Sequence, residues 1–179
     1  FAAGHALNVH AVEPEAYRLV KLRENLSRLG KVEAVTIHGQ TLQQFASEGG
    51  QSFNGILIDA PCSGTGVTGR HPDIRWNRRP EDLYRYQQEQ INLLHHAAAL
   101  LTPGGILVYA TCSLEPEENH GVIAAFLADH PAMHLTDCAE HLPEAAHRFI
   151  VDRCFAPRPD ATIDGFFAAR MQRSQPHAT

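Results

Sequence analysis

The sequence predicts an α/β fold built on a mostly parallel sheet with an antiparallel edge. Apolar segments of strand length alternate with longer amphipathic segments, and few hairpin signals separate them. A chain of 179 residues, 44% hydrophobic and 20% charged, has the composition of one compact domain. Strands joined by right-handed helical crossovers form a doubly wound sheet, so we expect ligands at the carboxyl ends of the strands.

The first predicted elements lie between residues 8 and 37. Residues 8–13 form a short apolar run typical of a buried strand. Residues 14–29 place apolar side chains near the helical period, and Gly30 is a stop signal. Residues 32–37 alternate in polarity, which predicts a second strand.

The middle of the chain predicts one strand, one long loop and one helix. Residues 53–59 are an apolar run that ends on an acid. The loop over 60–80 is rich in proline, glycine and arginine. A helix is expected over 81–101, because Pro103, Gly104 and Gly105 follow as a terminating signal.

The last third predicts a strand over 106–111 and a helix over 116–129. Two further extended runs, 149–155 and 165–171, flank the turn-like residues 157–160. We expect these two runs to form the antiparallel pair at one edge of the sheet.

The charge balance gives two opposite indications about nucleic acids. A net charge of −5 argues against a polyanion partner for the chain as a whole, since phosphate contacts are made by lysine and arginine. Locally, Arg70, Arg75, Arg78 and Arg79 surround Trp76 and could meet a phosphate backbone and stack on a base.

The four cysteines are scattered without a CxxC pair, which is typical of a reducing compartment and predicts no disulfide framework. No run of eighteen apolar residues occurs, so we expect no membrane span and a cytoplasmic protein. The twelve histidines show no ligand spacing, so we expect no metal ion.

Two loops that follow predicted strands each carry a cysteine. Cys62 follows the strand that ends at Asp59, and Cys112 follows the strand that ends at Thr111. If these strands are neighbours, Asp59 and both thiols surround one cleft. Carbon 5 of cytosine becomes nucleophilic when a thiolate adds to carbon 6, and an acid and a base then complete the reaction. The loops therefore predict cytosine chemistry on an unstacked base.

Structural roles remain open for the same residues. A cysteine after a strand is commonly a packing residue. Asp59 could cap a turn, and Glu117 and Asn119 could form the first turn of the next helix. Cys138 and Cys154 lie outside such loops and are interpreted as structural.

Four ordered motifs resemble the Sun/Fmu branch of the RNA 5-methylcytosine methyltransferases. They are Asp59-Ala60-Pro61-Cys62-Ser63-Gly64-Thr65-Gly66 with Arg70-His71-Pro72-Asp73-Ile74-Arg75-Trp76, Tyr109-Ala110-Thr111-Cys112-Ser113, Glu117-Glu118-Asn119, and Asp164-Gly165-Phe166-Phe167. The resemblance covers nearly the whole chain. It implies a Rossmann-like class I methyltransferase fold, with residues 1–179 as a partial catalytic domain dependent on S-adenosylmethionine.

The resemblance also implies roles for individual residues. Cys112 would be the nucleophile, Cys62 would assist product release, and Asp59 would line the cofactor and base site. Arg75 and Trp76 would belong to the substrate-side loop.

For the cofactor, Glu13 matches the acidic residue that holds the ribose hydroxyls. Gln40 falls on the adenine-contacting position, where the family usually has Asp. Family members act on ribosomal RNA or transfer RNA, and the Sun/Fmu branch favours ribosomal RNA.

One family feature is missing from the sequence. The family's first strand and glycine-rich loop should precede Phe1, so the chain is expected to be truncated before its first strand. We then expect weak binding of S-adenosylmethionine and an isolated fragment that could be inactive.

Three alternatives differ in chemistry. An amino-group methyltransferase would carry an Asp/Asn-Pro-Pro-aromatic loop where this chain has Asp59-Ala60-Pro61-Cys62. A non-catalytic RNA-binding domain is compatible with Gln40 and the missing loop. A thiol redox or zinc protein would need closer cysteine pairs than this chain has.

Overall fold

The computed structural model describes residues 8–175. The chain divides into two compact units, the first ending at Gly50 and the second beginning at Gln51. The strands form two sheets, one with two strands and one with six. Within residues 8–175, no helix is both long and apolar enough to span a bilayer.

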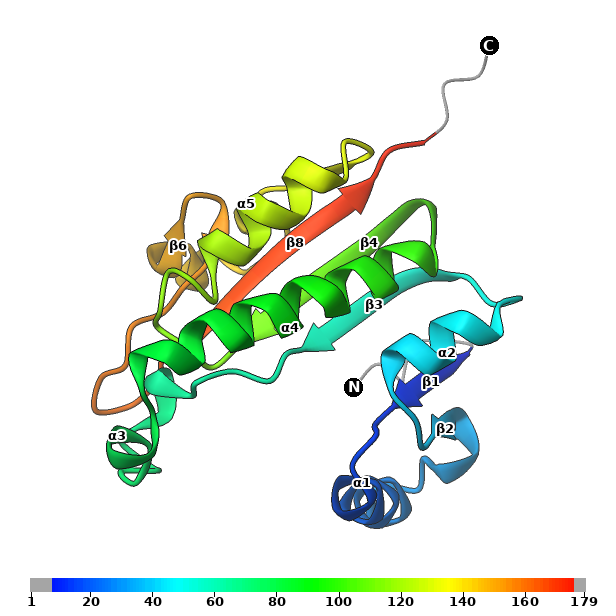
Figure 1. Ribbon diagram of the computed structural model, residues 1–179, viewed down its shortest axis with the longest axis horizontal. Helices are drawn as coiled ribbons and strands as arrows, with labels where there is room; N and C mark the ends of the chain where they lie inside the picture. Colours follow the sequence, from blue (N-terminus) through cyan, green and yellow to red (C-terminus); the bar gives the residue numbers. More distant parts are fainter. Residues whose placement is uncertain (1–7, 176–179) are drawn as a thin grey trace. The chain divides into compact units, whose positions relative to one another are not determined.

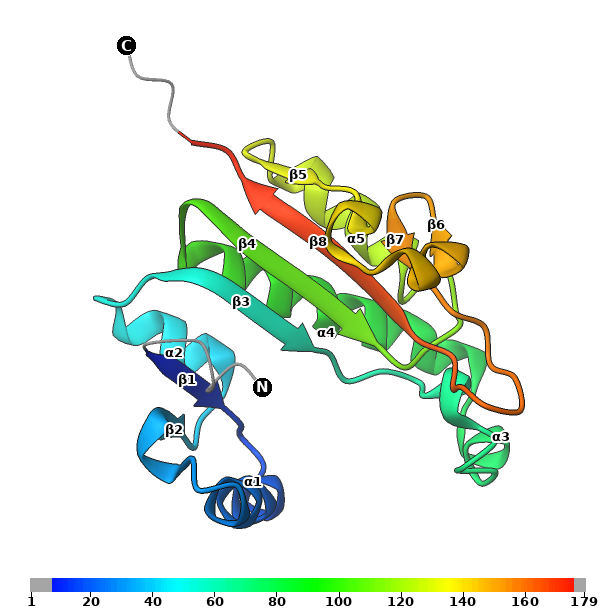
Figure 2. The ribbon, with the colours of Figure 1, turned by 180° about the vertical axis from the view of Figure 1, so that it is seen from behind.

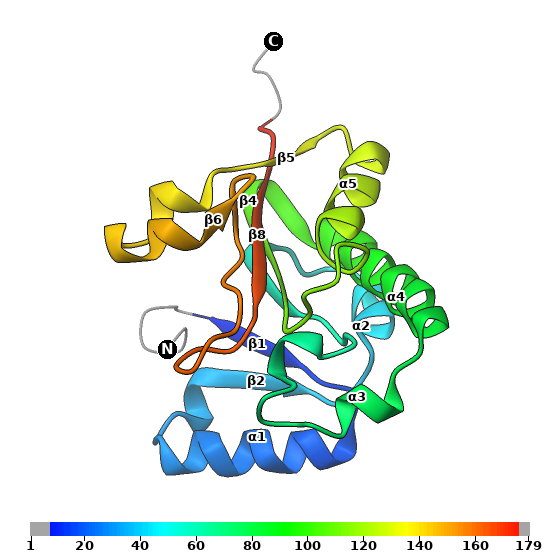
Figure 3. The same cartoon turned by 90° about the vertical axis from the view of Figure 1, so that its left-hand side faces the viewer.

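The first unit is a strand–helix–strand–helix arrangement. Its elements in order are β1 (Val9–Val12), α1 (Ala16–Arg28), the 3-10 turn η2 (Val32–Ala34), β2 (Val35–His38) and α2 (Leu42–Glu48). β1 and β2 pair in parallel, and α1 runs along one side of them (Figure 3). From α2, the buried Phe45 packs against the rings of His10 and His38, with centroid separations of 6.3 and 4.6 Å.

The second unit begins with two parallel strands. β3 (Phe53–Asp59) is followed by η3 (Thr65–Val67), α3 (Ile74–Asn77), α4 (Pro80–Ala99) and then β4 (Leu101–Thr111). β3 and β4 are in register from Gly55↔Ile106 to Asp59↔Ala110. This pairing places the loops after the two strands at the same edge of the sheet, as predicted.

The rest of the second unit adds antiparallel strand pairs to the sheet, and β8 is the strand that pairs with β4. It contains α5 (His120–Asp129), β5 (Met133–Leu135), η4 (Cys138–His141), η5 (Glu144–Phe149), β6 (Ile150–Val151), β7 (Cys154–Phe155) and β8 (Phe167–Arg173). The strand order is β3-β4-β8-β7-β6, and β5 also pairs with β8 (Figures 1 and 2). Figure 3 shows α4 and α5 on one side of this sheet and the segment from η4 to β7 on the other.

The core of the second unit is made by the sheet and its two long helices. Leu94 on α4, Leu107 and Tyr109 on β4, and Val122 and Phe126 on α5 are inaccessible to solvent. Burial of each such side chain stabilises the fold by about 1.5–3 kcal/mol. This core fixes the strand ends that carry the cysteine loops.

Several elements differ from the sequence prediction, among them β4, which begins at Leu101 rather than at residue 106. Residues 149–155 form a β6–β7 hairpin rather than one strand, because Asp152 and Arg153 adopt positive φ angles and reverse the chain. β8 lies between β4 and β7, so the antiparallel edge is confirmed but β8 is not its outermost strand. The strand β5 was not predicted, since three residues give little periodic signal.

Candidate active site

Cys62 and Cys112 meet where β3 and β4 end. Their sulfur atoms are 3.2 Å apart, although the residues are separated by 50 positions in the sequence. Backbone bonds hold the two loops side by side: the amide of Ala60 donates to Ala110, and the amide of Gly66 donates to Cys112, both at 2.9 Å. Both cysteines are partly accessible.

The two thiols have opposite acidities. The hydrogen bond from Cys62 lowers the pKa of Cys112 to about 7, against the opposing effects of burial and the negative charge of Asp59. The same hydrogen bond, followed by burial, raises the pKa of Cys62. Above about pH 7 the pair is therefore mainly a Cys112 thiolate that accepts a hydrogen bond from a Cys62 thiol. The neighbouring thiol is the main cause of the lowered pKa of Cys112.

A buried carboxylate joins the two cysteine loops. Glu118 is fully inaccessible, and its Oε1 accepts hydrogen bonds from the Ser63 amide at 2.8 Å and from Gln90 Nε2 at 3.0 Å. Its Oε2 accepts from the hydroxyls of Ser63 and Ser113. Ser63 directly follows Cys62, and Ser113 directly follows Cys112. Glu118 was assigned no role from the sequence, although in the motif Glu117-Glu118-Asn119 it is the buried acid and Glu117 is exposed.

The start of α5 is tied to the Cys112 loop. Asn119 Nδ2 donates to the Ser113 carbonyl at 2.9 Å, and its Oδ1 accepts from the Thr111 hydroxyl at 2.7 Å. The Tyr109 hydroxyl donates to the Glu118 carbonyl at 2.6 Å. These bonds give Asn119 a structural role in the first turn before α5, the alternative that the sequence left open.

The motif at residues 164–167 closes the site from a third side. The Gly165 amide donates to the Gly66 carbonyl at 2.8 Å, and Asp164 forms an ion pair with Arg70 at 3.0 Å. The backbones approach so closely that a Cβ at Gly66 would lie 2.8 Å from the Cys112 carbonyl oxygen. Only glycine fits at this position.

The motifs that meet in this site are those of one family. The family model described as 16S rRNA methyltransferase RsmB/F matches residues 3–172. The chain belongs to the RsmB/F family of 16S rRNA methyltransferases. This result confirms the resemblance stated from the sequence.

Relatives of known sequence and structure support the assignment to the RsmB/F family. "Ribosomal RNA small subunit methyltransferase B" of Sodalis glossinidius is 43% identical over 167 residues, 93% of this chain and 36% of the relative. The chain therefore spans about a third of the length of that relative. The crystal structure of NSun6 from Pyrococcus horikoshii with SFG is 26% identical with a TM-score of 0.78, covering 94% of this chain and 42% of that one. A methyltransferase homolog from the same organism is 33% identical with a TM-score of 0.70, covering 92% and 52%.

In this RsmB/F chain, Arg75 and Trp76 lie on the short helix α3, beside the Cys62 loop. Both are exposed, and 87% of Trp76 is accessible to solvent. The Ile74 side chain packs against Gly64 of the Cys62 loop, where a Cβ would be 3.1 Å from Ile74 Cδ1. Arg78 Nε donates to the Ser63 carbonyl at 2.8 Å. α3 is thus connected to the loop of Cys62 at both of its ends.

Of the three residues expected at the cofactor, Glu13 and Gln40 lie in the first unit, and Asp59 ends β3 in the second. The amide of Glu13 donates to His38 at 3.0 Å, and its carboxylate accepts from the Glu15 amide at 2.9 Å and lies 3.9 Å from Arg18. Gln40 follows β2, and its buried Nε2 has no hydrogen-bond partner within the described part of the chain. A buried donor without an acceptor costs free energy.

The remaining cysteines of this RsmB/F chain lie away from the loops. Cys138 and Cys154 are buried, and burial raises the pKa of Cys154 to about 12. Neither is ionised near neutral pH. This burial agrees with their structural interpretation.

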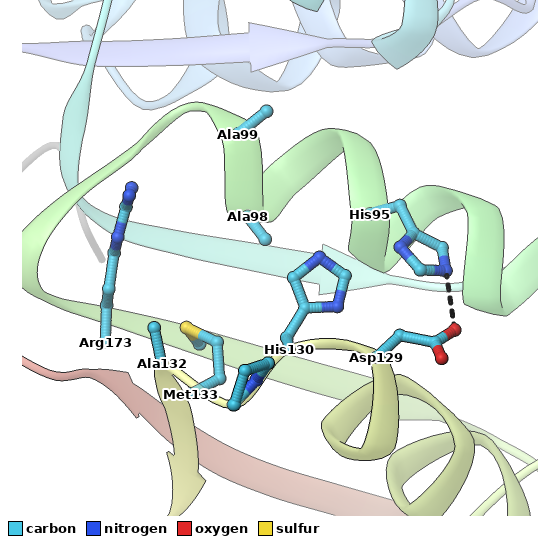
Figure 4. A pocket seen from close by; sticks show the side chains of 9 residues that line it. His95, Ala98, Ala99, Asp129, His130, Ala132, Met133 and Arg173 are labelled. Atoms are coloured by element: carbon cyan, nitrogen blue, oxygen red, sulfur yellow. Dashed lines mark ion pairs between the residues drawn. The ribbon is translucent and has the colours of Figure 1, made fainter.

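A hollow of about 300 Å³ lies at the end of the six-stranded sheet opposite the cysteine loops (Figure 4). His95 from α4 lies 3.8 Å from Asp129 at the end of α5, and His130 and Arg173 complete its polar lining. Burial, then His130, lowers the pKa of His95. Arg173 ends β8 and donates to the carbonyl of Leu101, the first residue of β4, so the hollow is far from Cys112, which follows the last residue of β4.

Proposed function

We propose that this chain carries the catalytic site that methylates carbon 5 of a cytosine in ribosomal RNA, through a covalent adduct with Cys112. Membership of the RsmB/F family supports RNA methylation. The observation that carries the choice of carbon 5 is the cysteine pair, with sulfur atoms 3.2 Å apart and the pKa of Cys112 lowered to about 7. Amino-group methylation needs no thiolate.

The Cys112 thiolate starts the reaction. Its Sγ adds to carbon 6 of the cytosine, and the new S–C6 bond places electron density on carbon 5. S-adenosylmethionine, when bound, supplies the electrophilic methyl group that carbon 5 takes up. Asp59 ends β3 at the edge where both cysteine loops begin, and there its carboxyl can hydrogen-bond to the ring nitrogen or amine of the base.

Cys62 completes the reaction. Its pKa is raised mainly because its thiol donates to the Cys112 sulfur. Once Cys112 is a thioether, this thiolate acceptor no longer exists, so the main cause that keeps Cys62 protonated is removed. Cys62 can then lose its proton to solvent, and the resulting thiolate takes the proton from carbon 5 while the S–C6 bond breaks to release Cys112 as a thiolate and the methylated ring.

Within the first unit, Glu13 and Gln40 are the residues that would contact the cofactor. Glu13 offers carboxylate oxygens to ribose hydroxyls, and the unpartnered Gln40 Nε2 offers a donor to the adenine ring. NSun6, which shares this fold, was solved with SFG, an analogue of S-adenosylmethionine. These donors and acceptors fit the cofactor.

The RNA would be held in part by α3. Arg75 offers a charge to a phosphate, and Trp76 offers an exposed ring on which a base can stack. The relatives named as small-subunit rRNA methyltransferases favour ribosomal over transfer RNA.

The test is covalent trapping with RNA that contains 5-fluorocytidine, whose carbon 5 has no proton to lose. With S-adenosylmethionine present, we expect a slowly migrating protein–RNA band on a denaturing gel. Cys112→Ala should abolish the band, and the matched change Cys138→Ala should keep it. A protein that binds S-adenosylmethionine and methylates RNA without forming the band would overturn the proposal and favour amino-group methylation.

A further inference from the structure

The buried acid Glu118 contacts neither sulfur atom, yet it bonds to the residue that follows each cysteine. Its four acceptor positions are filled by the Ser63 amide, the Ser63 and Ser113 hydroxyls and Gln90 Nε2. A carboxylate accepts all four hydrogen bonds and needs no donor of its own. Glu118 is therefore fully engaged and has no free position for a substrate.

We infer that Glu118 is a positioning residue that sets the distance between Cys62 and Cys112 by holding Ser63 and Ser113 on one carboxylate. The inference rests on the proposed function, in which Cys112 is the nucleophile. Ser63 Oγ and Ser113 Oγ lie 3.1 Å apart, alongside the sulfur atoms at 3.2 Å. The carboxylate thus joins two loops that the sequence separates by 50 positions.

The surrounding contacts support a fixed geometry. Gln90 comes from α4 and also donates to the Pro61 carbonyl at 2.9 Å, so the helix holds the residue before Cys62. Glu118 itself lies in the turn before α5, and the Tyr109 hydroxyl of β4 donates to its carbonyl. The cluster therefore connects both helices and the central strand to the cysteine loops.

The positioning role and a simple charge effect predict opposite results. The groups whose charges act on Cys112 are Asp59, Cys62 and Glu118, and the charge of Glu118 opposes ionisation of Cys112. If Glu118 acted only through its charge, Glu118→Gln would lower the pKa of Cys112. If it positions the pair, the same change lets Cys62 move away, the main hydrogen bond to the thiolate weakens, and the pKa rises.

The experiment measures alkylation of Cys112 by iodoacetamide from pH 5 to 10, with each cysteine followed by peptide mass spectrometry. For Glu118→Gln we expect the midpoint of the Cys112 profile to rise by about one unit or more, toward the ordinary value near 8.5. In a Cys62→Ala background the midpoint should already be raised, and Glu118→Gln should add no further rise. An unchanged or lowered midpoint in Glu118→Gln alone would overturn the inference.

Two further variants separate positioning from general loss of stability. Phe126→Leu weakens the core under α5 without touching the loops, and it should leave the midpoint in place. If Glu118→Gln does not fold, Ser113→Ala removes one of the four donors and should raise the midpoint by less, whereas no rise would again contradict the inference. The readout needs no methyl transfer, so failure of 5-fluorocytidine trapping would count against the proposed function alone.

Discussion

The Sγ atoms of Cys62 and Cys112 lie 3.2 Å apart, and both residues are free thiols. A disulfide needs about 2.05 Å between sulfur atoms, so only a small movement separates the pair from a covalent bond. The reduced state is therefore a condition for the proposed chemistry, because a disulfide would occupy the nucleophile.

Hydrogen peroxide is expected to join this pair. The Cys112 thiolate attacks the peroxide to give a sulfenic acid and hydroxide, which takes a proton from solvent, and the Cys62 thiol then displaces water to form the disulfide. Intact-mass measurement should show the loss of two hydrogens per chain, and dithiothreitol should reverse it. Cys138→Ala should behave as the parent does, while Cys112→Ala should not form the bond. If the unsubstituted chain accumulates only sulfinic acid at Cys112 and no disulfide, the prediction is wrong.

Adduct formation with 5-fluorocytidine RNA is expected to fall as the pH drops below about 7, because the pKa of Cys112 is about 7 and the thiolate exists above it. The rate should be measured from pH 5.5 to 9. In Cys62→Ala the midpoint should move up toward about 8.5, since the hydrogen bond that stabilises the thiolate is lost. If the pH midpoint of adduct formation in the unsubstituted chain is already about 8.5, Cys62 does not lower the pKa of Cys112.

Gly66→Ala is expected to destabilise the second unit by about 1–3 kcal/mol, because the added Cβ would overlap the Cys112 carbonyl and Gly165. Urea unfolding measures the change. Gly69→Ala is the matched control, since a Cβ at Gly69 meets nothing within 4 Å. If both substitutions change the free energy of unfolding equally, the loops of Gly66, Cys112 and Gly165 can move apart without loss of stability.

The sequence predicted the location of the site because that location follows from strand order. Once Asp59 and Thr111 were assigned to the ends of parallel strands, Cys62 and Cys112 had to share one edge of the sheet, and the register Asp59↔Ala110 confirms this. The role of Glu118 could not be predicted from the sequence. It lies between two other polar residues, Glu117 and Asn119, so no hydrophobic periodicity marks it as buried. Only its inaccessibility and its four donors identify it.

One helix that received no bounds from the sequence did have a sequence signal. The helix α2 (Leu42–Glu48) begins with a capping box in which the Thr41 hydroxyl accepts from the Gln44 amide at 3.2 Å and the Gln44 side chain accepts from the Thr41 amide at 3.0 Å. The spacing Thr-x-x-Gln is a recognised helix start. Its bounds were not predicted because seven residues offer less than two full turns of apolar pattern.

Arg75→Ala is expected to weaken RNA binding about equally for all sequences and to reduce the slope of log Kd against log salt by about one. Binding should be measured by filter retention at several salt concentrations. Lys21→Ala, on α1 in the first unit, is a charge-matched control that should keep the parent slope. An unchanged slope in Arg75→Ala would remove Arg75 from the RNA-binding surface.

Trp76→Ala is expected to weaken single-stranded RNA binding by about 1–3 kcal/mol, which corresponds to roughly 5- to 150-fold in Kd, because a stacked base loses its platform. The thermal unfolding midpoint should not change, since 87% of Trp76 is exposed and its removal leaves no cavity. Val151→Ala removes another exposed apolar side chain, on the β6–β7 hairpin, and should leave Kd at the parent value. Trp76→Phe should recover much of the loss if stacking is the cause. If Trp76→Phe is as weak as Trp76→Ala, the ring does not stack on a base, and α3 would contribute to RNA binding through its arginines alone.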